Sequence, residues 1–248
     1  MNICDSYNAF ACFYDELMSD VDYRGRAEYI DGIIKKYKPD AHLLVDLACG
    51  TGSMTVEFSS MGYDVIGVDM SEEMLSRARE KSDSGILYLC QSMQELDMYG
   101  TIDAFVCTMD SLNHLESPEQ ILLALSRVSL FLEPDGIFVF DMNTPYKHEK
   151  VLADNSFVYE TDNVFCVWRN EYAGGGRVNI SLDFFQPQAD GSYLRYCEDF
   201  SETAYSIEET ERMLNQAGLE MVAVYDDMSS DPPRDDSLRL IFIARKSE

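Results

Sequence analysis

Apolar and polar residues alternate along residues 42–141 in two distinct rhythms. Short runs rich in aliphatic residues recur between longer stretches in which apolar residues return every three or four positions, as on one face of a helix. The short runs predict strands and the longer stretches predict helices. Their alternation predicts a parallel, doubly wound sheet of the Rossmann-like α/β class. We expect strands near residues 42–47, 63–68, 86–90, 103–107 and 136–141, and helices near residues 51–60, 71–82 and 118–132.

The alternation stops after Asn143. Short strand-like runs fill residues 156–203, and turns such as Gly174-Gly175-Gly176 separate them in the manner of antiparallel hairpins. The remaining chain returns to the first rhythm, with a helix expected from Ser206 to Gly218 and strands near residues 219–225 and 238–244. We therefore expect a discontinuous α/β domain of residues 1–144 and 205–248, with residues 145–204 inserted as a small antiparallel β unit.

The apolar run that ends at Leu47 breaks abruptly into a turn of small residues, Ala48-Cys49-Gly50-Thr51-Gly52. Glycine lets the backbone turn sharply and approach a ligand closely. The next strand ends on Asp69, whose carboxylate can accept the hydroxyl hydrogens of a ribose at the general ligand site of open α/β sheets. The loop lacks the third glycine of a pyrophosphate-binding Gly-x-Gly-x-x-Gly loop. With Asp46 before the turn, the pattern predicts a site for a nucleoside-containing cofactor without phosphates.

These residues, Val-Asp-Leu-Ala-Cys-Gly-Thr-Gly followed by Gly-Val-Asp-Met-Ser, resemble class I S-adenosylmethionine-dependent methyltransferases. The resemblance implies S-adenosylmethionine as the cofactor. It places the adenine between Met70 and the Ser92-Met93 pair, although Ser92 stands where an aspartate is common; plain core packing is the alternative for both methionines. The cofactor-binding residues expected on this basis are Tyr14, Tyr23, Asp46, Ala48, Gly50, Gly52, Asp69, Met70, Ser92, Met93 and Met109.

The amino-terminal segment from Tyr7 to Asp15 resembles the Tyr…Phe-Ala-x-x-Tyr-Asp segment of small-molecule methyltransferases that include sugar N,N-dimethyltransferases. In these enzymes the corresponding helix covers the cofactor. The resemblance implies that Tyr14 contacts cofactor or acceptor, that Tyr23 helps to close the lid, and that His114 lies near the acceptor. We take Tyr14 and His114 as the candidate catalytic residues; a structural aromatic contact and a surface histidine are the alternatives.

The same resemblance includes the β insertion, which we expect to form one wall of the acceptor pocket. Phe200 and Thr203 depart from it, because histidine and arginine are frequent at these two positions. The substrate side of the pocket is therefore the part that the resemblance defines least.

The charge of the chain limits its partners. It carries 19 basic and 45 acidic residues, a net charge of −26, and has no basic patch with interleaved aromatic residues. Proteins that grip nucleic acid neutralise phosphates with lysine and arginine, so a nucleic-acid substrate is disfavoured. We expect a small-molecule acceptor that is methylated at an amine nitrogen. The alternatives are a tRNA or protein methyltransferase, and a catalytically silent regulator that binds S-adenosylmethionine.

The cysteines and the apolar runs bear on location. Seven scattered cysteines without a Cys-x-x-Cys pair predict reduced, mostly buried thiols. The amino terminus lacks the pattern of a signal peptide, and no apolar run is long enough to span a membrane. No His, Cys, Asp and Glu cluster has the spacing of a metal site. These features predict a cytoplasmic protein without a metal, and they do not predict its oligomeric state.

Overall fold

A computed structural model describes residues 8–82 and 85–247 of the chain. The helices are α1 (Asn8–Leu17), α2 (Tyr23–Tyr37), α3 (Ser53–Ser60), α4 (Glu72–Lys81), α5 (Pro118–Phe131) and α6 (Ile207–Gln216). The strands are β1 (Leu43–Leu47), β2 (Asp64–Asp69), β3 (Leu87–Cys90), β4 (Ile102–Cys107), β5 (Leu132–Asn143), β6 (Ser156–Glu160), β7 (Phe165–Gly174), β8 (Arg177–Pro187), β9 (Tyr193–Thr203), β10 (Leu219–Asp226) and β11 (Arg239–Lys246).

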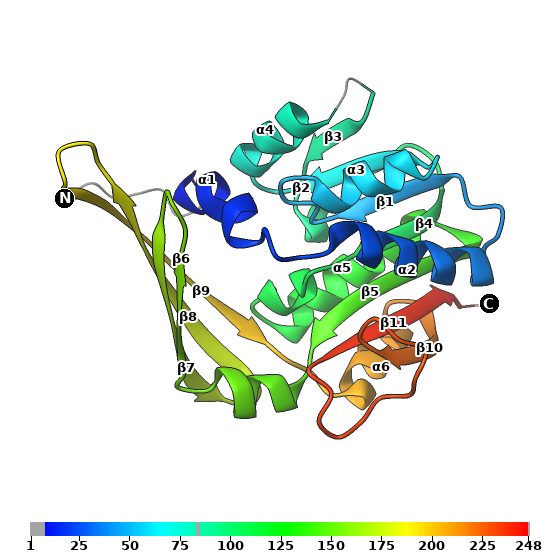
Figure 1. The fold of residues 1–248 in the computed structure, drawn as a ribbon. Coiled ribbons are helices and arrows are strands. Elements are labelled where there is room, and N and C mark those ends of the chain that lie inside the picture. The colour runs from blue at the N-terminus through cyan, green and yellow to red at the C-terminus, as the bar shows by residue number, and fades with distance from the viewer. Residues whose placement is uncertain (1–7, 83–84, 248) are drawn as a thin grey trace.

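The central sheet has seven strands in the order β10-β11-β5-β4-β1-β2-β3 (Figure 1). β1 runs parallel to both β2 and β4, whereas β11 runs antiparallel to both β5 and β10. The chain leaves β1 toward β2 on one side and returns to β4 on the other, so the order of the sheet reverses beside β1. Such a switch point leaves a crevice at the carboxyl ends of the strands. The expected Rossmann-like class is confirmed.

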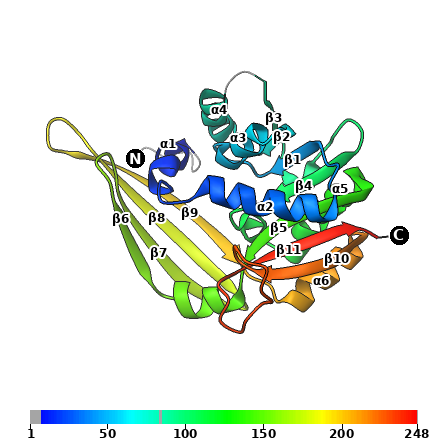
Figure 2. The same cartoon turned by 45° about the vertical axis from the view of Figure 1, so that its right-hand side comes forward.

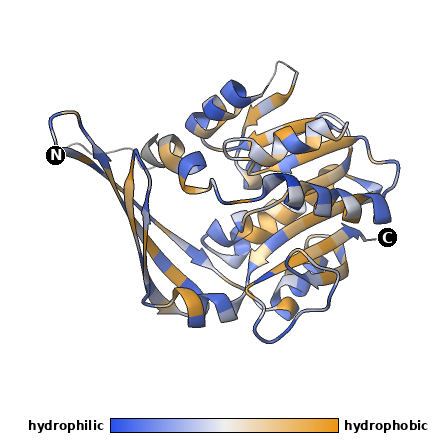
Figure 3. Ribbon diagram, in the orientation of Figure 1, coloured by the Kyte–Doolittle hydropathy of each residue, from blue (hydrophilic) through white to orange (hydrophobic). Residues whose placement is uncertain are grey.

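Helices cover both faces of this sheet (Figure 2). One face packs Ile30 and Ile34 of α2 and Phe58 of α3 against alternate strand residues such as Val139. The other face packs Leu125 of α5 and Leu214 of α6 against the intervening positions. Because the parallel strands are buried on both sides, they are almost uniformly hydrophobic, as Figure 3 shows for the centre of the sheet.

The second sheet is antiparallel, with strands in the order β6-β7-β8-β9. It lies within the segment expected as the insertion. The chain leaves the central sheet after β5, forms these four strands, and returns before α6. Helix α1 packs on one face of this sheet: the ring of Phe13 stacks on Phe184 with centroids 5.7 Å apart and also meets Tyr196. Helix α1 and this second sheet therefore lie on the side of the central sheet where the strands β1, β2 and β4 end (Figure 1).

Helix α2 and the short helical segments were not among the expected elements. Helix α2 contains Gly25 and Gly32, which weaken a helical pattern. It forms because Asp22 caps it, accepting a hydrogen bond from the backbone of Gly25, and because it buries an apolar stripe that includes Ile30. A short π-helical segment, η3 (Lys147–Leu152), follows β5 and was likewise unexpected.

The expectation of mostly buried cysteines is wrong in part. Among the described side chains Cys107 and Cys166 are buried, Cys49 is intermediate, and Cys90 and Cys197 are exposed. Cys90 ends the short strand β3 at the edge of the sheet, where few elements cover it. No helix in the described part of the chain is both long and apolar enough to cross a membrane. Tyr7 and Cys4 lie outside the described residues, and the side chain of Cys12 is not described.

Candidate active site

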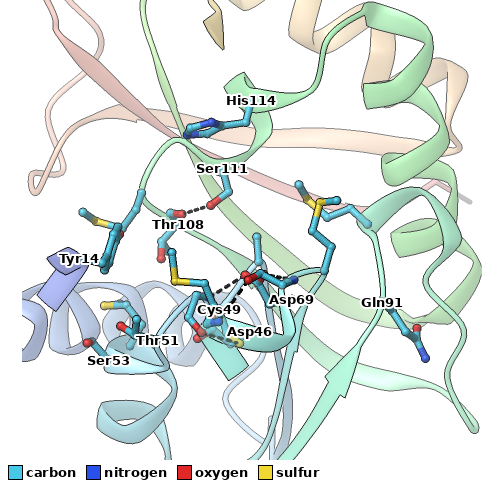
Figure 4. A pocket seen from close by; sticks show the side chains of 18 of the residues that line it. Tyr14, Asp46, Cys49, Thr51, Ser53, Asp69, Gln91, Thr108, Ser111 and His114 are labelled. Atoms are coloured by element: carbon cyan, nitrogen blue, oxygen red, sulfur yellow. Dashed lines mark hydrogen bonds between the residues drawn. The ribbon is translucent and has the colours of Figure 1, made fainter. Parts of the chain in front are cut away.

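A cavity opens at the carboxyl ends of β1, β2 and β4 (Figure 4). It brings together segments from five parts of the chain, including helix α1 and the turn after β4. Figure 4 shows Tyr14 and Gln91 on opposite sides of this cavity, with Asp46 and Asp69 between them. Ten of the expected site residues line it: Tyr14, Tyr23, Asp46, Ala48, Gly50, Asp69, Met70, Met93, Met109 and His114.

The turn after β1 exposes backbone to the cavity. Ala48 has φ 59° and Gly50 has φ 54°, both in the left-handed region. A Cβ atom added to Gly50 would meet no atom within 4 Å, so the free space beside it is open to a ligand. Gly52 is different, because a Cβ there would lie 2.9 Å from the Ala78 Cβ atom. Gly52 does not line the cavity, and its lack of a side chain lets α3 and α4 approach each other.

Asp69 ties this turn to the next one. Its two carboxylate oxygens accept hydrogen bonds from the backbone N–H groups of Gly50, at 2.8 Å, and Ser71, at 2.9 Å. Burial raises the pKa of Asp69, and the backbone N–H groups of Ser71, Gly50 and Met70 oppose that shift. Each carboxylate oxygen has a further lone pair. A carboxylate oriented in this way and facing the cavity fits the two hydroxyl groups of a ribose.

Asp46 is the deeper acid of the pair. It is 1% exposed, and one of its oxygens accepts a hydrogen bond of 2.5 Å from the Thr55 hydroxyl. Burial raises the pKa of Asp46 to about 7; the Thr55 bond opposes the rise and the nearby Asp69 charge adds to it. A buried carboxyl group with this pKa favours a positively charged partner, because a cation stabilises its ionised form. The carboxyl groups of Asp46 and Asp69 therefore fit a ligand that has both hydroxyl and cationic groups.

Methionines line the side of the cavity near β3. Met70 is 63% exposed and Met93 is partly buried, so both leave apolar surface for a flat ring. Gln91 and Gln94 also line this side and were not among the expected residues. Ser92 lies outside the lining, and its hydroxyl hydrogen-bonds to Glu95 at 3.3 Å. The glutamines could have been suggested by their position at the end of β3.

Polar contacts hold helix α1 against the glycine turn. Asp15 accepts hydrogen bonds from the Thr51 hydroxyl, at 2.6 Å, and from the Lys81 ammonium, at 2.8 Å. Lys81 also donates to Thr51 and Ser53. This cluster positions Tyr14 above the cavity. Burial is the largest cause that raises the pKa of Tyr14, and the nearby Tyr23 and Asp110 add to it. Tyr14 therefore stays a neutral phenol at physiological pH.

The turn after β4 is the most constrained part of the wall. Met109 and Asp110 have φ of 60° and 55°, which non-glycine residues seldom adopt. Asp141 of β5 holds this turn by accepting hydrogen bonds from both backbone N–H groups, at 2.9 and 2.6 Å. The next residues form the short helical turn η2 (Ser111–His114), which brings His114 to the cavity.

Arg239 of β11 stabilises the same turn through two ion pairs. It contacts the Asp110 carboxylate at 3.0 Å and the Asp141 carboxylate at 2.8 Å. Burial would raise the pKa of Asp110, but the charges of Arg239 and Lys147 and the hydrogen bond from Asn143 outweigh that effect and hold it well below its usual range. This support could not be predicted from the sequence, because Arg239 and Asp110 are 129 positions apart.

Comparison with known proteins agrees with this architecture. The methyltransferase domain family matches residues 44–136, which run from β1 through α5 into the start of β5. The chain is 33% identical over 247 residues to "Putative methyltransferase YqeM" of Bacillus subtilis (strain 168), covering 98% of both chains. A solved S-adenosylmethionine-dependent methyltransferase from Clostridium acetobutylicum ATCC 824 has a TM-score of 0.86 at 31% identity, covering 98% of this chain and 99% of that one. The protein belongs to the S-adenosylmethionine-dependent methyltransferases.

A further relative carries a more specific name. The chain is 28% identical over 150 residues to a dTDP-3-amino-3,4,6-trideoxy-alpha-D-glucopyranose N,N-dimethyltransferase of Streptomyces venezuelae. The matched region covers 60% of this chain and 61% of that one. The expected resemblance to sugar N-methyltransferases and the expected cofactor are thus confirmed. The roles of individual site residues remain predictions.

Proposed function

We propose that this enzyme transfers a methyl group from S-adenosylmethionine to the nitrogen of a small-molecule amine. The observation that carries the proposal is the position of His114, which lines the cofactor cavity and also a neighbouring polar groove between η2 and the β8-β9 hairpin. An imidazole at that junction can accept a proton from an acceptor whose nitrogen points into the cavity. The amino-sugar N,N-dimethyltransferase relative supports a nitrogen acceptor.

The residues of the cavity divide the work of such a transfer. When bound, the cofactor supplies a methyl group activated by its sulfonium, and the S–CH₃ bond breaks with the electron pair left on sulfur. Asp69 and the backbone of the glycine turn would hold the nucleoside, and Tyr14 would cover it. His114 would take the proton that a protonated amine must lose before its nitrogen can form the new N–C bond. Positioning of this kind can supply about 7–11 kcal/mol in favourable cases.

The charge of the protein supports a small, cationic acceptor rather than a polynucleotide. The residues that line the cavity include Asp46 and Asp69, and Asp110 directly follows the lining residue Met109. The whole chain carries 45 acidic residues against 19 basic ones. A polyanion would meet repulsion over most of this surface, whereas an ammonium group would be attracted.

The direct test is a screen with S-adenosylmethionine labelled in its methyl group. Purified enzyme would be incubated with small amines, amino sugars, phenols and a metabolite extract, and labelled products would be identified by mass spectrometry. Label on the nitrogen of an amine supports the proposal. Label transferred to an oxygen or to added protein would overturn it, and cofactor binding without transfer to any acceptor would favour a silent regulator.

A gel-shift titration with tRNA addresses the remaining alternative. The low number of basic residues predicts no retention of tRNA at moderate salt, since retention depends on phosphate neutralisation. Tight, salt-sensitive binding together with methylated tRNA would replace the small-molecule proposal.

A further inference from the structure

A buried carboxylate joins His114 to a second histidine that no known role accounts for. Glu202 of β9 is 3% exposed, and its Oε1 atom lies 3.6 Å from Nε2 of His114. Its Oε2 atom lies 3.5 Å from Nε2 of His148, which is fully buried in η3. The side-chain amide of Asn143 donates to the same Oε2 atom at 3.1 Å. The row His114–Glu202–His148 therefore runs from the cavity wall into the interior.

Hydrogen-bond chemistry fixes the state of one nitrogen in this row. Nδ1 of His148 lies 2.7 Å from the carbonyl oxygen of Gly176. A carbonyl oxygen only accepts, so Nδ1 carries a hydrogen. A neutral His148 would then turn the bare lone pair of Nε2 toward the Glu202 carboxylate, and Nε2 has no other hydrogen-bond partner among the described residues. Two lone pairs facing each other in the interior are unfavourable, and a proton between them removes the conflict.

The surrounding charges also call for this proton. The pKa of the Lys147 ammonium is influenced by four nearby charges. The carboxylates of Asp110, Asp141 and Glu202 raise it, and the guanidinium of Arg239 lowers it. Three carboxylates thus face two cations in this buried group. Arg26 and Asp227 add one charge of each sign nearby: they pair with each other at 2.9 Å, and Arg26 also lies 3.8 Å from Asp141. One imidazolium would balance the group, and imidazole is more basic than a carboxylate in water.

We propose that His148 is an imidazolium paired with ionised Glu202, and that this pair holds His114 with its proton on Nε2. Glu202 Oε1 then faces the Nε2–H of His114, which leaves the lone pair on Nδ1 as the basic position. Glu202 and His148 are positioning residues, because neither lines the cavity. The inference rests on the proposed amine transfer for its use in catalysis, but the protonation state itself does not depend on the acceptor.

The pair gives the proposed reaction a defined path for its proton. An N–H bond of the protonated amine breaks, the proton moves to Nδ1 of His114, and the freed electron pair forms the bond to the methyl carbon. The imidazolium of His114 is stabilised by the Glu202 carboxylate. Because the His114 side chain is 42% exposed, it can release the proton to solvent afterwards.

Nitrogen-15 NMR of the histidine rings tests the proposal in the complex with S-adenosylhomocysteine, without an acceptor. The chain has only three histidines, His42, His114 and His148. We expect protons on both ring nitrogens of His148 near neutral pH, and a proton on Nε2 of neutral His114. In Glu202→Gln, His148 should lose its Nε2 proton and His114 should populate both tautomers. His42 precedes β1 at the opposite end of that strand and should not change.

Glu198→Gln is the matched control. Glu198 is also a buried glutamate of β9 on the same face as Glu202, and its Oε2 atom has no hydrogen-bond partner among the described residues. This variant should leave the His114 and His148 signals unchanged. A bare Nε2 on His148 in the wild-type protein would overturn the proposal, even if Glu202→Gln failed to fold. An unchanged His114 tautomer in a folded Glu202→Gln variant would also overturn it.

An acceptor found in the labelling screen would add a kinetic readout. Glu202→Gln should lower kcat by about 10-fold or more while KM changes little, because the lost contact orients the base and does not bind the acceptor. Equal kcat in a folded variant would contradict the catalytic use of the pair. Loss of the amine proposal in the screen would leave the NMR result standing, so the two failures are distinguishable.

Discussion

The two sides of the cavity are built in different ways. The cofactor side is made from turns that directly follow strands of one sheet: Gly50 and Asp69 are 19 positions apart and joined by a hydrogen bond. The acceptor side is assembled from α1, η2 and β9, and its contacts join residues such as His114 and Glu202 that are far apart in the chain. A local motif can therefore specify the first side, whereas only the assembled fold creates the second. We expect the two sides to be separable by mutation.

The largest effect is expected on the cofactor side. Asp69→Ala removes a carboxylate that we expect to accept two charge-assisted hydrogen bonds from the ribose, each worth about 1.5–3 kcal/mol. Affinity for S-adenosylmethionine should fall by a factor of roughly 100 or more. Isothermal titration calorimetry measures the loss. Unchanged affinity in Asp69→Ala would remove Asp69 from the site.

A comparably large effect on stability is expected behind the acceptor side. Arg239→Met removes the cation that contacts both buried carboxylates, those of Asp110 and Asp141, which costs about 3–5 kcal/mol in the free energy of unfolding. Denaturant titration measures this cost. Arg245→Met on the same strand breaks an exposed pair with Glu220 and should change stability by less than about 1 kcal/mol. Equal losses in the two variants would mean that the buried network does not support the turn.

A smaller and purely kinetic effect is expected for Tyr14. Tyr14→Phe keeps the ring over the cavity and removes only the hydroxyl group, so affinity for S-adenosylhomocysteine should stay within a few-fold. Turnover should fall if the hydroxyl contacts the acceptor or the transition state. Single-turnover methyl transfer, measured beside the melting temperature, separates this result from a structural role. A drop in melting temperature with activity falling only as the folded fraction falls would make Tyr14 a structural contact.

The smallest effect concerns the proton on Asp46. Its pKa of about 7 means that a proton is partly bound at neutral pH in the free enzyme. A cationic ligand favours the ionised carboxylate, so binding of S-adenosylmethionine should release up to one proton and should tighten as pH rises through 7. Calorimetry in buffers of different ionisation enthalpy counts the released protons. S-adenosylhomocysteine, which lacks the sulfonium charge, should release fewer, and Asp46→Asn should abolish the difference.

The sequence predicted the fold well where pattern and neighbourhood coincide. The strands of the central sheet are buried on both faces, and their uniform hydrophobicity marks them clearly. The glycine turn and Asp69 were found because one βαβ unit contains them both. Helix α2 was not predicted, because Gly25 and Gly32 weaken its helical pattern. Its apolar stripe, which includes Ile30, is stabilised only by packing against the central sheet.

The acceptor side could be predicted only in part. The resemblance supplied Tyr14 and His114, which do line the cavity. Nothing in the local sequence links His148 to Glu202, since η3 and β9 are far apart in the chain and only the tertiary fold brings them together. The restraint of Met109 and Asp110 by Asp141 likewise depends on the pairing of β4 with β5. Long-range polar contacts of this kind leave no periodic pattern in a single sequence.

The separation of the two sides is tested most directly by the affinity of His114→Asn for S-adenosylhomocysteine, measured by calorimetry beside Asp69→Ala. The asparagine removes the proposed base from the acceptor side and leaves Asp69 and the glycine turn untouched. We predict an affinity within a few-fold of the wild type for His114→Asn, against a loss of roughly 100-fold or more for Asp69→Ala. A loss in folded His114→Asn as large as that in Asp69→Ala would contradict the division of the cavity into a cofactor side and an acceptor side.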